Sequence, residues 1–149
     1  YVRRYFNIVI GERTAEEAKK EIGTAMPGAD PDKSTEIKGR DLMTGLPKVI
    51  TITSEEINKA ISEQIEDIVA AVKEVLEKTP PELAGDIMNR GIVMTGGGSL
   101  LNGLDELISE RTGLPTYIPE GAISCVALGT GMALQNLSVL ESSASGNVL

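Results

Sequence analysis

Hydrophobic positions recur along this chain with two periods, three to four residues and two residues, and together they predict an α/β fold. The longest helical pattern follows Ser54, where apolar residues return every three or four positions within a polar segment. These residues are Ile57, Ile61, Ile65, Ile68, Val72, Val75 and Leu76. We expect one long helix with this stripe in the core and Ser54 as its N-cap, ending at Thr79-Pro80-Pro81, where a short helix begins.

The segments before this helix predict a small helix and a β-hairpin. Residues 34–42 and 47–53 are rich in β-formers, and the turn between them contains Gly45, which can supply a positive φ. Upstream, Thr14–Glu17 has the pattern of a capping box. It predicts a helix over residues 15–25.

The segments after the long helix alternate strand and helix. The wholly apolar residues 91–94 predict a short strand that is covered on both faces. A leucine pattern predicts a helix over residues 100–111, and residues 114–119 predict a second strand. Residues 123–137 predict a last helix, whose two interior glycines indicate a close packing contact.

Three consecutive glycines, Gly96 to Gly98, separate the apolar strand from the helix that follows Ser99. Each glycine costs conformational entropy on folding, so the run needs a reason. A strand, a glycine loop and a helix form the arrangement by which a backbone approaches a ligand at the carboxyl end of a sheet. The alternative is a tight turn that uses glycine for its dihedral freedom, and the loop alone does not decide between the two. No Walker loop or dinucleotide fingerprint is present.

Two charged residues of the first helix are a second candidate for ligand contact. Glu16 and Lys19 are three residues apart and therefore lie on one helix face. A carboxylate can accept hydrogen bonds from ribose hydroxyls, while a lysine stem can lie against a base. Without other evidence, such a pair is ordinary surface charge.

Composition narrows the functional classes. The formal net charge is −8, which argues against a nucleic-acid surface because phosphate backbones are bound by clustered Lys and Arg. The chain has no histidine, so the usual metal and nucleophilic constellations are missing, and we expect no catalytic residue and no metal ligand here. Cys125 is the single cysteine, which excludes an internal disulfide and fits a reducing cytoplasm. We expect it to be a small packed residue near a helix start.

Four blocks of sequence resemble the MreB and Mbl family of bacterial actin homologues. They are "IGERTAEEAKKEIGTAMP", "KGRDLMTGLPKVITITSEE", "LEKTPPELAGDIMNRGIVMTGGGSLLNGLDELISERTGLP" and "SCVALGTGMAL", and the likeness extends from Tyr1 to about Leu137. The resemblance implies part of an actin-like ATPase (ribonuclease H-like) fold. It places a small inserted α/β lobe (subdomain IIB-like) at residues 1–54, part of a larger α/β lobe (subdomain IIA-like) at residues 55–140, and a flexible tail at residues 141–149.

The resemblance also implies a ligand and a site. In this family, segments similar to "TGGGS" and "EEAK" border the base and ribose of ATP. The corresponding residues are Gly96, Gly97, Gly98, Ser99, Glu16, Glu17 and Lys19. The Asp-containing glycine-rich hairpins that hold the phosphates and Mg2+ in the family have no counterpart in this sequence. We therefore expect the sequence to be the carboxy-terminal part of a longer protein.

By the same resemblance, the complete protein is a slow ATPase that forms filaments and determines rod cell shape by organising wall synthesis, whereas this part alone is inactive. Expected partners are other copies of the protein and the membrane proteins of rod-shape morphogenesis. The expected location is the cytoplasm, at the inner face of the cell membrane, with membrane contact through the missing half. Two alternatives stay open: a small-molecule kinase of the actin superfold, and a nucleotide-independent interaction module. Nucleotide-dependent pelleting, with and without phosphoryl acceptors, would separate the three.

Overall fold

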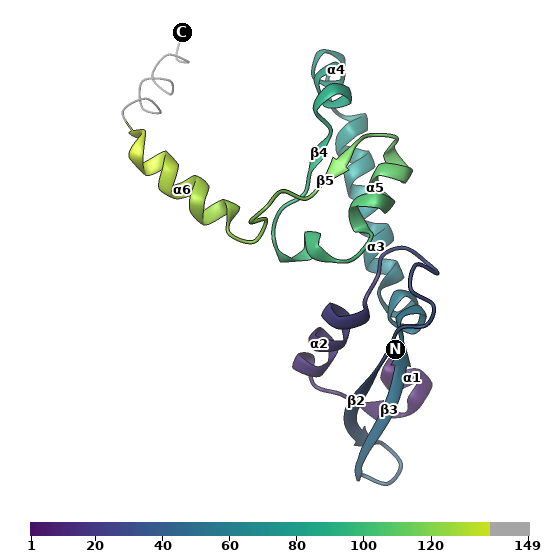
Figure 1. Cartoon of the computed structure of the whole chain (residues 1–149). Coiled ribbons are helices and arrows are strands. Elements are labelled where there is room, and N and C mark those ends of the chain that lie inside the picture. Colours follow the sequence, from purple (N-terminus) through teal and green to yellow (C-terminus); the bar gives the residue numbers. More distant parts are fainter. Residues whose placement is uncertain (138–149) are drawn as a thin grey trace.

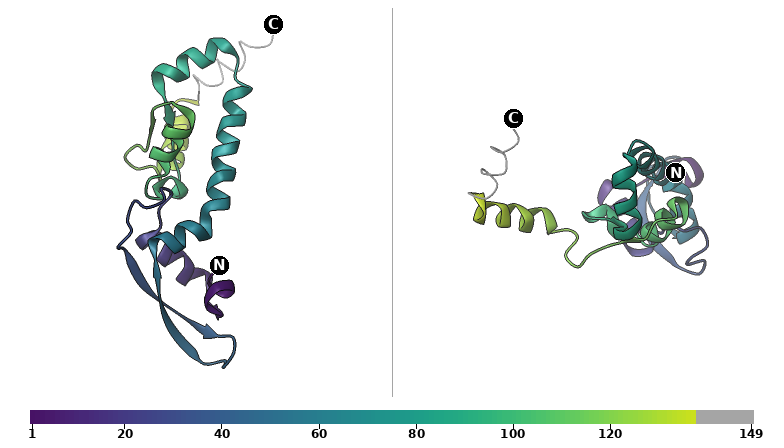
Figure 2. Two further views of the ribbon diagram at one scale, coloured as in Figure 1. Left: turned by 90° about the vertical axis from the view of Figure 1, so that its right-hand side faces the viewer. Right: turned by 90° about the horizontal axis from the view of Figure 1, so that it is seen from above.

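The computed structural model describes residues 1–137, and most of its elements lie along one long helix (Figure 1). The elements in chain order are α1 (Val2–Phe6), β1 (Ile8–Val9), α2 (Glu12–Ile22), β2 (Ser34–Asp41), β3 (Pro47–Thr53), α3 (Ser54–Glu77), α4 (Pro81–Arg90), β4 (Ile92–Val93), the 3-10 helix η1 (Gly97–Leu100), α5 (Leu104–Thr112), β5 (Thr116–Tyr117) and α6 (Cys125–Gln135). Figure 2 shows the elongated shape from the side, with the β2–β3 hairpin and α4 at opposite ends.

The hairpin predicted from sequence is confirmed. β2 and β3 pair antiparallel from Ser34 opposite Thr53 to Arg40 opposite Pro47, and β1 extends the sheet along the other edge of β2. Gly45 has φ +75° in the connecting turn, as expected. The inner side of the sheet packs with α2 and the start of α3 in one hydrophobic cluster: Ala18, Ile22, Ile37, Ile52 and Ile57.

A second hydrophobic cluster lies farther along α3. It consists of Ala25, Ile65, Val69, Leu104, Leu107 and Ile108, contributed by α3, α5 and the segment after α2. β4 and β5 pair in parallel beside α5. The expectation that the apolar strand is covered on both faces is wrong within the described residues, because Val93 is 50% exposed on this two-stranded sheet.

The long helix forms as predicted, but its start and its buried stripe differ. Thr53 is the N-cap in place of Ser54: its hydroxyl accepts the Glu56 N–H at 3.3 Å, and the Glu56 carboxylate accepts the Thr53 N–H at 2.9 Å. Val69 is 2% exposed, whereas Ile68, assigned to the stripe, is 44% exposed. An α-helix has 3.6 residues per turn, so side chains spaced by three or four residues gradually rotate away from one packing partner. The positions that face α5 therefore shift along α3.

The first predicted helix is also displaced in sequence. α2 begins at Glu12 with Gly11 as its N-cap and ends at Ile22, so the capping box at Thr14 is wrong. Thr14 lies inside the first turn, and Glu17 instead forms an ion pair with Arg13 at 2.8 Å. Capping requires an extended backbone at the cap residue, which Gly11 has and Thr14, inside the helix, lacks.

α6 extends away from the other elements and has no buried residue (Figure 2). Gly129 has nothing within 4 Å of the position where a Cβ would lie, and the same is true of Gly131, so the expected close contact does not occur within the described part. Cys125 begins the helix and is half-buried. The tail expected at residues 141–149 lies outside the described residues, and the lobe boundary at residue 54 stays a prediction.

Candidate functional site

The glycine-rich loop contains one turn of 3-10 helix rather than the start of an α-helix. Gly96 has φ +83°, and η1 then runs from Gly97 to Leu100. α5 begins at Leu104, after a second positive φ at Gly103, so the helix expected from residue 100 starts four residues later. The strand–loop–helix order is as predicted, but the first amides after the glycines belong to η1 and not to an α-helix.

Only one of the three glycines is required by the backbone. Gly96 needs glycine because its φ lies in the region that L side chains rarely adopt. Gly97 and Gly98 have no positive φ, and nothing lies within 4 Å of their Cβ positions. A turn that used glycine for dihedral freedom alone would need one glycine here, so the absence of side chains at the other two has no explanation within the described fold.

Ser99 faces inward. Its side chain is 4% exposed, and its hydroxyl donates to the Gly96 carbonyl oxygen at 2.7 Å. The Gly96 N–H donates in turn to the Ala122 carbonyl at 2.8 Å. Ser99 therefore holds the loop closed, while Gly97 and Gly98 are the exposed part of its backbone.

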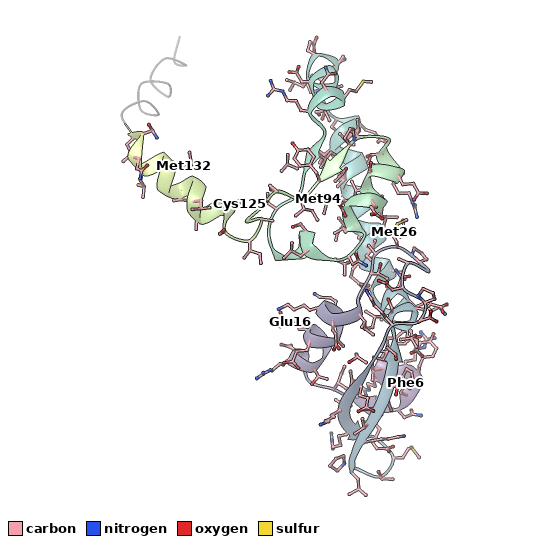
Figure 3. All side chains as sticks on the ribbon, in the orientation of Figure 1. Phe6, Glu16, Met26, Met94, Cys125 and Met132 are labelled. Atoms are coloured by element: carbon pink, nitrogen blue, oxygen red, sulfur yellow. The ribbon has the colours of Figure 1, made fainter. Side chains whose placement is uncertain are left out.

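The charged candidates of α2 are all exposed on that helix. Glu16 forms an ion pair with Lys20 at 2.6 Å, and this hydrogen-bonded lysine lowers the pKa of the Glu16 carboxyl, with a smaller contribution from Lys19. Among the described residues, no carboxylate lies within ion-pair distance of Lys19. Figure 3 labels Glu16 on α2.

An open cavity of about 650 Å³ lies beside α2. Glu12, Glu16 and Lys19 line one side of it, and the remaining lining is mostly apolar, from α1, the sheet and α3. The cavity does not reach the glycine-rich loop. The structure thus places Glu16 and Lys19 at one cavity and Gly96–Ser99 outside it, with Glu17 paired to Arg13 on the outer surface.

The two candidate segments are nevertheless joined through the residues that follow each of them. In Figure 1 and in the side view of Figure 2, the glycine-rich loop lies next to the C-terminal end of α2. Thr24 and Asn102 form a parallel β-bridge, and the Ala25 N–H donates to the Asn102 carbonyl at 2.7 Å. Asn58 of α3 donates from Nδ2 to the Thr24 carbonyl at 2.9 Å and to the Ala25 carbonyl at 3.2 Å.

Sequence reasoning did not find Thr24, Asn58 and Asn102. Thr24 is 1% exposed and Asn58 is 7% exposed, although both are polar. Their partners lie tens of residues away in sequence, so no local pattern marks them. The available signal was weak: Asn58 is an uncharged polar residue that directly follows the core residue Ile57.

Comparison with known proteins agrees with this architecture. The family model described as MreB/Mbl protein matches residues 1–142. The chain is 49% identical over 140 residues to the cell shape-determining protein Mbl of Bacillus cereus, covering 94% of this chain and 42% of that protein. It is 48% identical over 139 residues to the cell shape-determining protein MreB of Escherichia coli, covering 93% of this chain and 40% of that protein.

A solved structure gives the same result in three dimensions. The crystal structure of MreB 5 of Spiroplasma citri bound to AMPPNP superposes with a TM-score of 0.87 at 40% identity, over 97% of this chain and 43% of that one. The fold is therefore the actin-like α/β fold in part, and the chain spans about two fifths of the length of these relatives. The family model and both relatives together establish that this chain belongs to the MreB/Mbl family of actin-like proteins.

Proposed function

We propose that this chain supplies the base and ribose contacts for ATP in a longer, filament-forming cell shape-determining protein. Its relatives carry the name cell shape-determining protein, and a similar structure was determined with an ATP analogue bound. The observation that carries the proposal is the exposed backbone at Gly97 and Gly98, where neither φ nor crowding calls for glycine. A nucleoside that lies against this backbone would explain why side chains are absent there.

In this proposal each candidate residue has a distinct part. The loop backbone at Gly97 and Gly98 borders the nucleoside, and Ser99 keeps the loop in shape through its bond to Gly96. Glu16 accepts hydrogen bonds from ribose hydroxyls, and the Lys19 stem lies against the base with its ammonium free for oxygen acceptors. Glu17, the next residue, would contribute from the outer surface of α2, where it pairs with Arg13. In the folded chain the Glu16 carboxyl has a lowered pKa, so it is charged and acceptor-only at neutral pH.

Phosphoryl transfer needs groups that these residues do not offer. Its transition state is stabilised by positioned cations and donors around the phosphates, and ATP hydrolysis by the complete protein would rely on Mg2+ for this. Among the described residues, no cluster of His, Cys, Asp and Glu has the arrangement of a metal site. In this proposal Mg2+ and catalysis belong to the part of the longer protein outside this chain, and the complete protein is a slow ATPase.

Self-association and contacts with rod-shape morphogenesis proteins belong to the same proposal. Large apolar side chains are exposed at α6 and at the tip of the hairpin: Val126, Leu128, Met132, Leu134, Leu42, Met43 and Leu46. Exposed apolar surface of this extent is typical of surfaces that are covered in a larger assembly. No helix among residues 1–137 has both the length and the apolar character to cross a membrane. The proposed location is the inner face of the cell membrane, reached through the rest of the protein.

Titration of the 15N-labelled chain with adenosine, ADP and GTP tests the nucleotide site. We expect adenosine and ADP to shift the amide signals of Gly97, Gly98 and Lys19 at millimolar concentration, and GTP to shift them less. Unchanged spectra at 10 mM adenosine would refute the site. Sedimentation of the longer protein with ATP, with ADP and without nucleotide then tests filament formation; equal pelleting in all three would support the nucleotide-independent module.

A further inference from the structure

A cluster of hydrogen bonds around the buried residues Thr24, Ala25 and Asn58 lies between the two segments of the proposed nucleotide site. We call it the Thr24 cluster, and it consists of Thr24, Ala25, Asn58 and Asn102. Thr24 follows Lys19 by five residues, and Asn102 follows Ser99 by three. The cluster is the point at which the chain leaving α2 contacts the chain leaving the glycine-rich loop.

The hydroxyl and the backbone carbonyl of Thr24 both have hydrogen-bond partners. Its hydroxyl oxygen accepts the Met26 N–H at 3.2 Å, and its proton has the Asn102 carbonyl and the Met26 carbonyl, each 3.3 Å away, as acceptors. Its carbonyl accepts from Asn58 Nδ2 at 2.9 Å. Buried hydrogen bonds of this kind fix geometry because a displaced partner leaves an unsatisfied polar group.

The surrounding packing makes Thr24 the junction of the two halves of the structure. Ile22, two residues before Thr24, belongs to the hydrophobic cluster of the hairpin half, and Ala25, the next residue, belongs to the cluster around α5. Gly103 approaches Met26 so closely that a Cβ would lie 2.8 Å from Met26 Cγ. A change at Thr24 therefore alters the position of α2 relative to the glycine-rich loop more directly than it alters either hydrophobic cluster.

We infer that Thr24 is a positioning residue for nucleoside binding. Its hydroxyl bonds to the Asn102 carbonyl and thereby sets the distance between two segments. One segment carries Glu16 and Lys19 on α2, and the other is the exposed backbone at Gly97 and Gly98. This inference rests on the proposed function. Thr24 does not touch the nucleoside itself. It controls whether both segments contact the same nucleoside at once.

The test compares Thr24→Val with Thr24→Ser in the 15N-labelled chain. Valine has nearly the shape of threonine without the hydroxyl, whereas serine keeps the hydroxyl. Val69→Ala, which truncates a core residue of α3 but removes none of the hydrogen bonds of the Thr24 cluster, is the control for lower stability alone. Each variant is titrated with adenosine, and residual dipolar couplings of α2 and α5 amides report the relative orientation of the two helices.

We expect Thr24→Val to weaken adenosine binding by about fivefold or more, the effect of losing about one buried hydrogen bond, and to change the dipolar couplings of α2 relative to α5. Thr24→Ser and Val69→Ala should bind adenosine as the unsubstituted chain does. Unchanged binding by a folded Thr24→Val overturns the inference, and so does equal weakening in Val69→Ala. If the unsubstituted chain itself does not bind adenosine, the proposed function fails and the inference with it. If Thr24→Val does not fold, Thr24→Ala, which also removes the hydroxyl that bonds to the Asn102 carbonyl, supplies the binding and orientation measurements, and unchanged binding and couplings there overturn the inference.

Discussion

The substitution Gly97→Val distinguishes two explanations of the glycine-rich loop. In one, the glycines leave space for a ligand; in the other, they are needed for the backbone conformation. Because Gly97 has no positive φ and has open space where a Cβ would lie, the folded chain should accept valine. We expect the free energy of unfolding to change by no more than about 0.5 kcal/mol, as for other exposed positions. The same substitution at Gly96 should cost about 1–3 kcal/mol, because φ +83° with ψ 171° is a conformation that essentially only glycine adopts.

The expected effect on binding is larger than the effect on stability. The valine methyl groups would occupy the space against the loop and separate a nucleoside from the backbone groups of Gly97 and Gly98. Losing about two hydrogen bonds at about 1 kcal/mol each weakens adenosine binding by about 30-fold. Of Gly96 and Gly97, only Gly96 has a positive φ, so conformational strain is expected at Gly96 and not at Gly97.

Chemical denaturation and adenosine titration of the same protein samples measure the two effects. Gly85→Val is the matched control, because Gly85 is also open at its Cβ position but lies in α4, which Figure 1 shows away from the glycine-rich loop. Gly85→Val should bind adenosine normally. Adenosine binding by Gly97→Val equal to that of the unsubstituted chain would refute the reasoning, and a parallel loss of stability and binding would favour the turn explanation.

Three further predictions concern other regions. The Asp41 carboxylate accepts hydrogen bonds from the Thr44 N–H, the Lys48 ammonium and the Met43 N–H, and these bonds lower its pKa to about 2. Its stabilising contribution is therefore complete above about pH 4 and is lost as the pH falls toward 2. Urea unfolding of Asp41→Asn should match that of the unsubstituted chain at pH 2 but not at pH 5. Gly103→Ala should lower the free energy of unfolding by about 1–3 kcal/mol, and by more than Gly113→Ala, because both have φ +72° but only Gly103 meets Met26; equal losses would contradict the contact. The purified chain with Mg2+ and ATP should release no phosphate above the background rate, and turnover like that of an actin-like ATPase would show that catalytic groups lie in this chain.

The sequence by itself determined the elements that depend on neighbouring residues. The hairpin follows from two β-prone segments around Gly45, and the long helix follows from its apolar repeat and from the prolines that end it. The order of strand, glycine-rich loop and helix was also readable, as was the family. These features depend on local propensity and on periodicity, which act over a few residues.

Tertiary contacts decided what no local pattern encodes. The junction of Thr24 with Asn102 joins residues 78 positions apart, and the burial of Val69 in place of Ile68 depends on where α5 packs. The use of Gly11 as the N-cap of α2 and of Thr53 as the N-cap of α3 depended on backbone conformation one to three residues from the expected positions. Only the folded backbone shows whether a glycine is needed for its φ or leaves open space beside the chain. Gly96 has the positive φ, and the adjacent Gly97 has the open space.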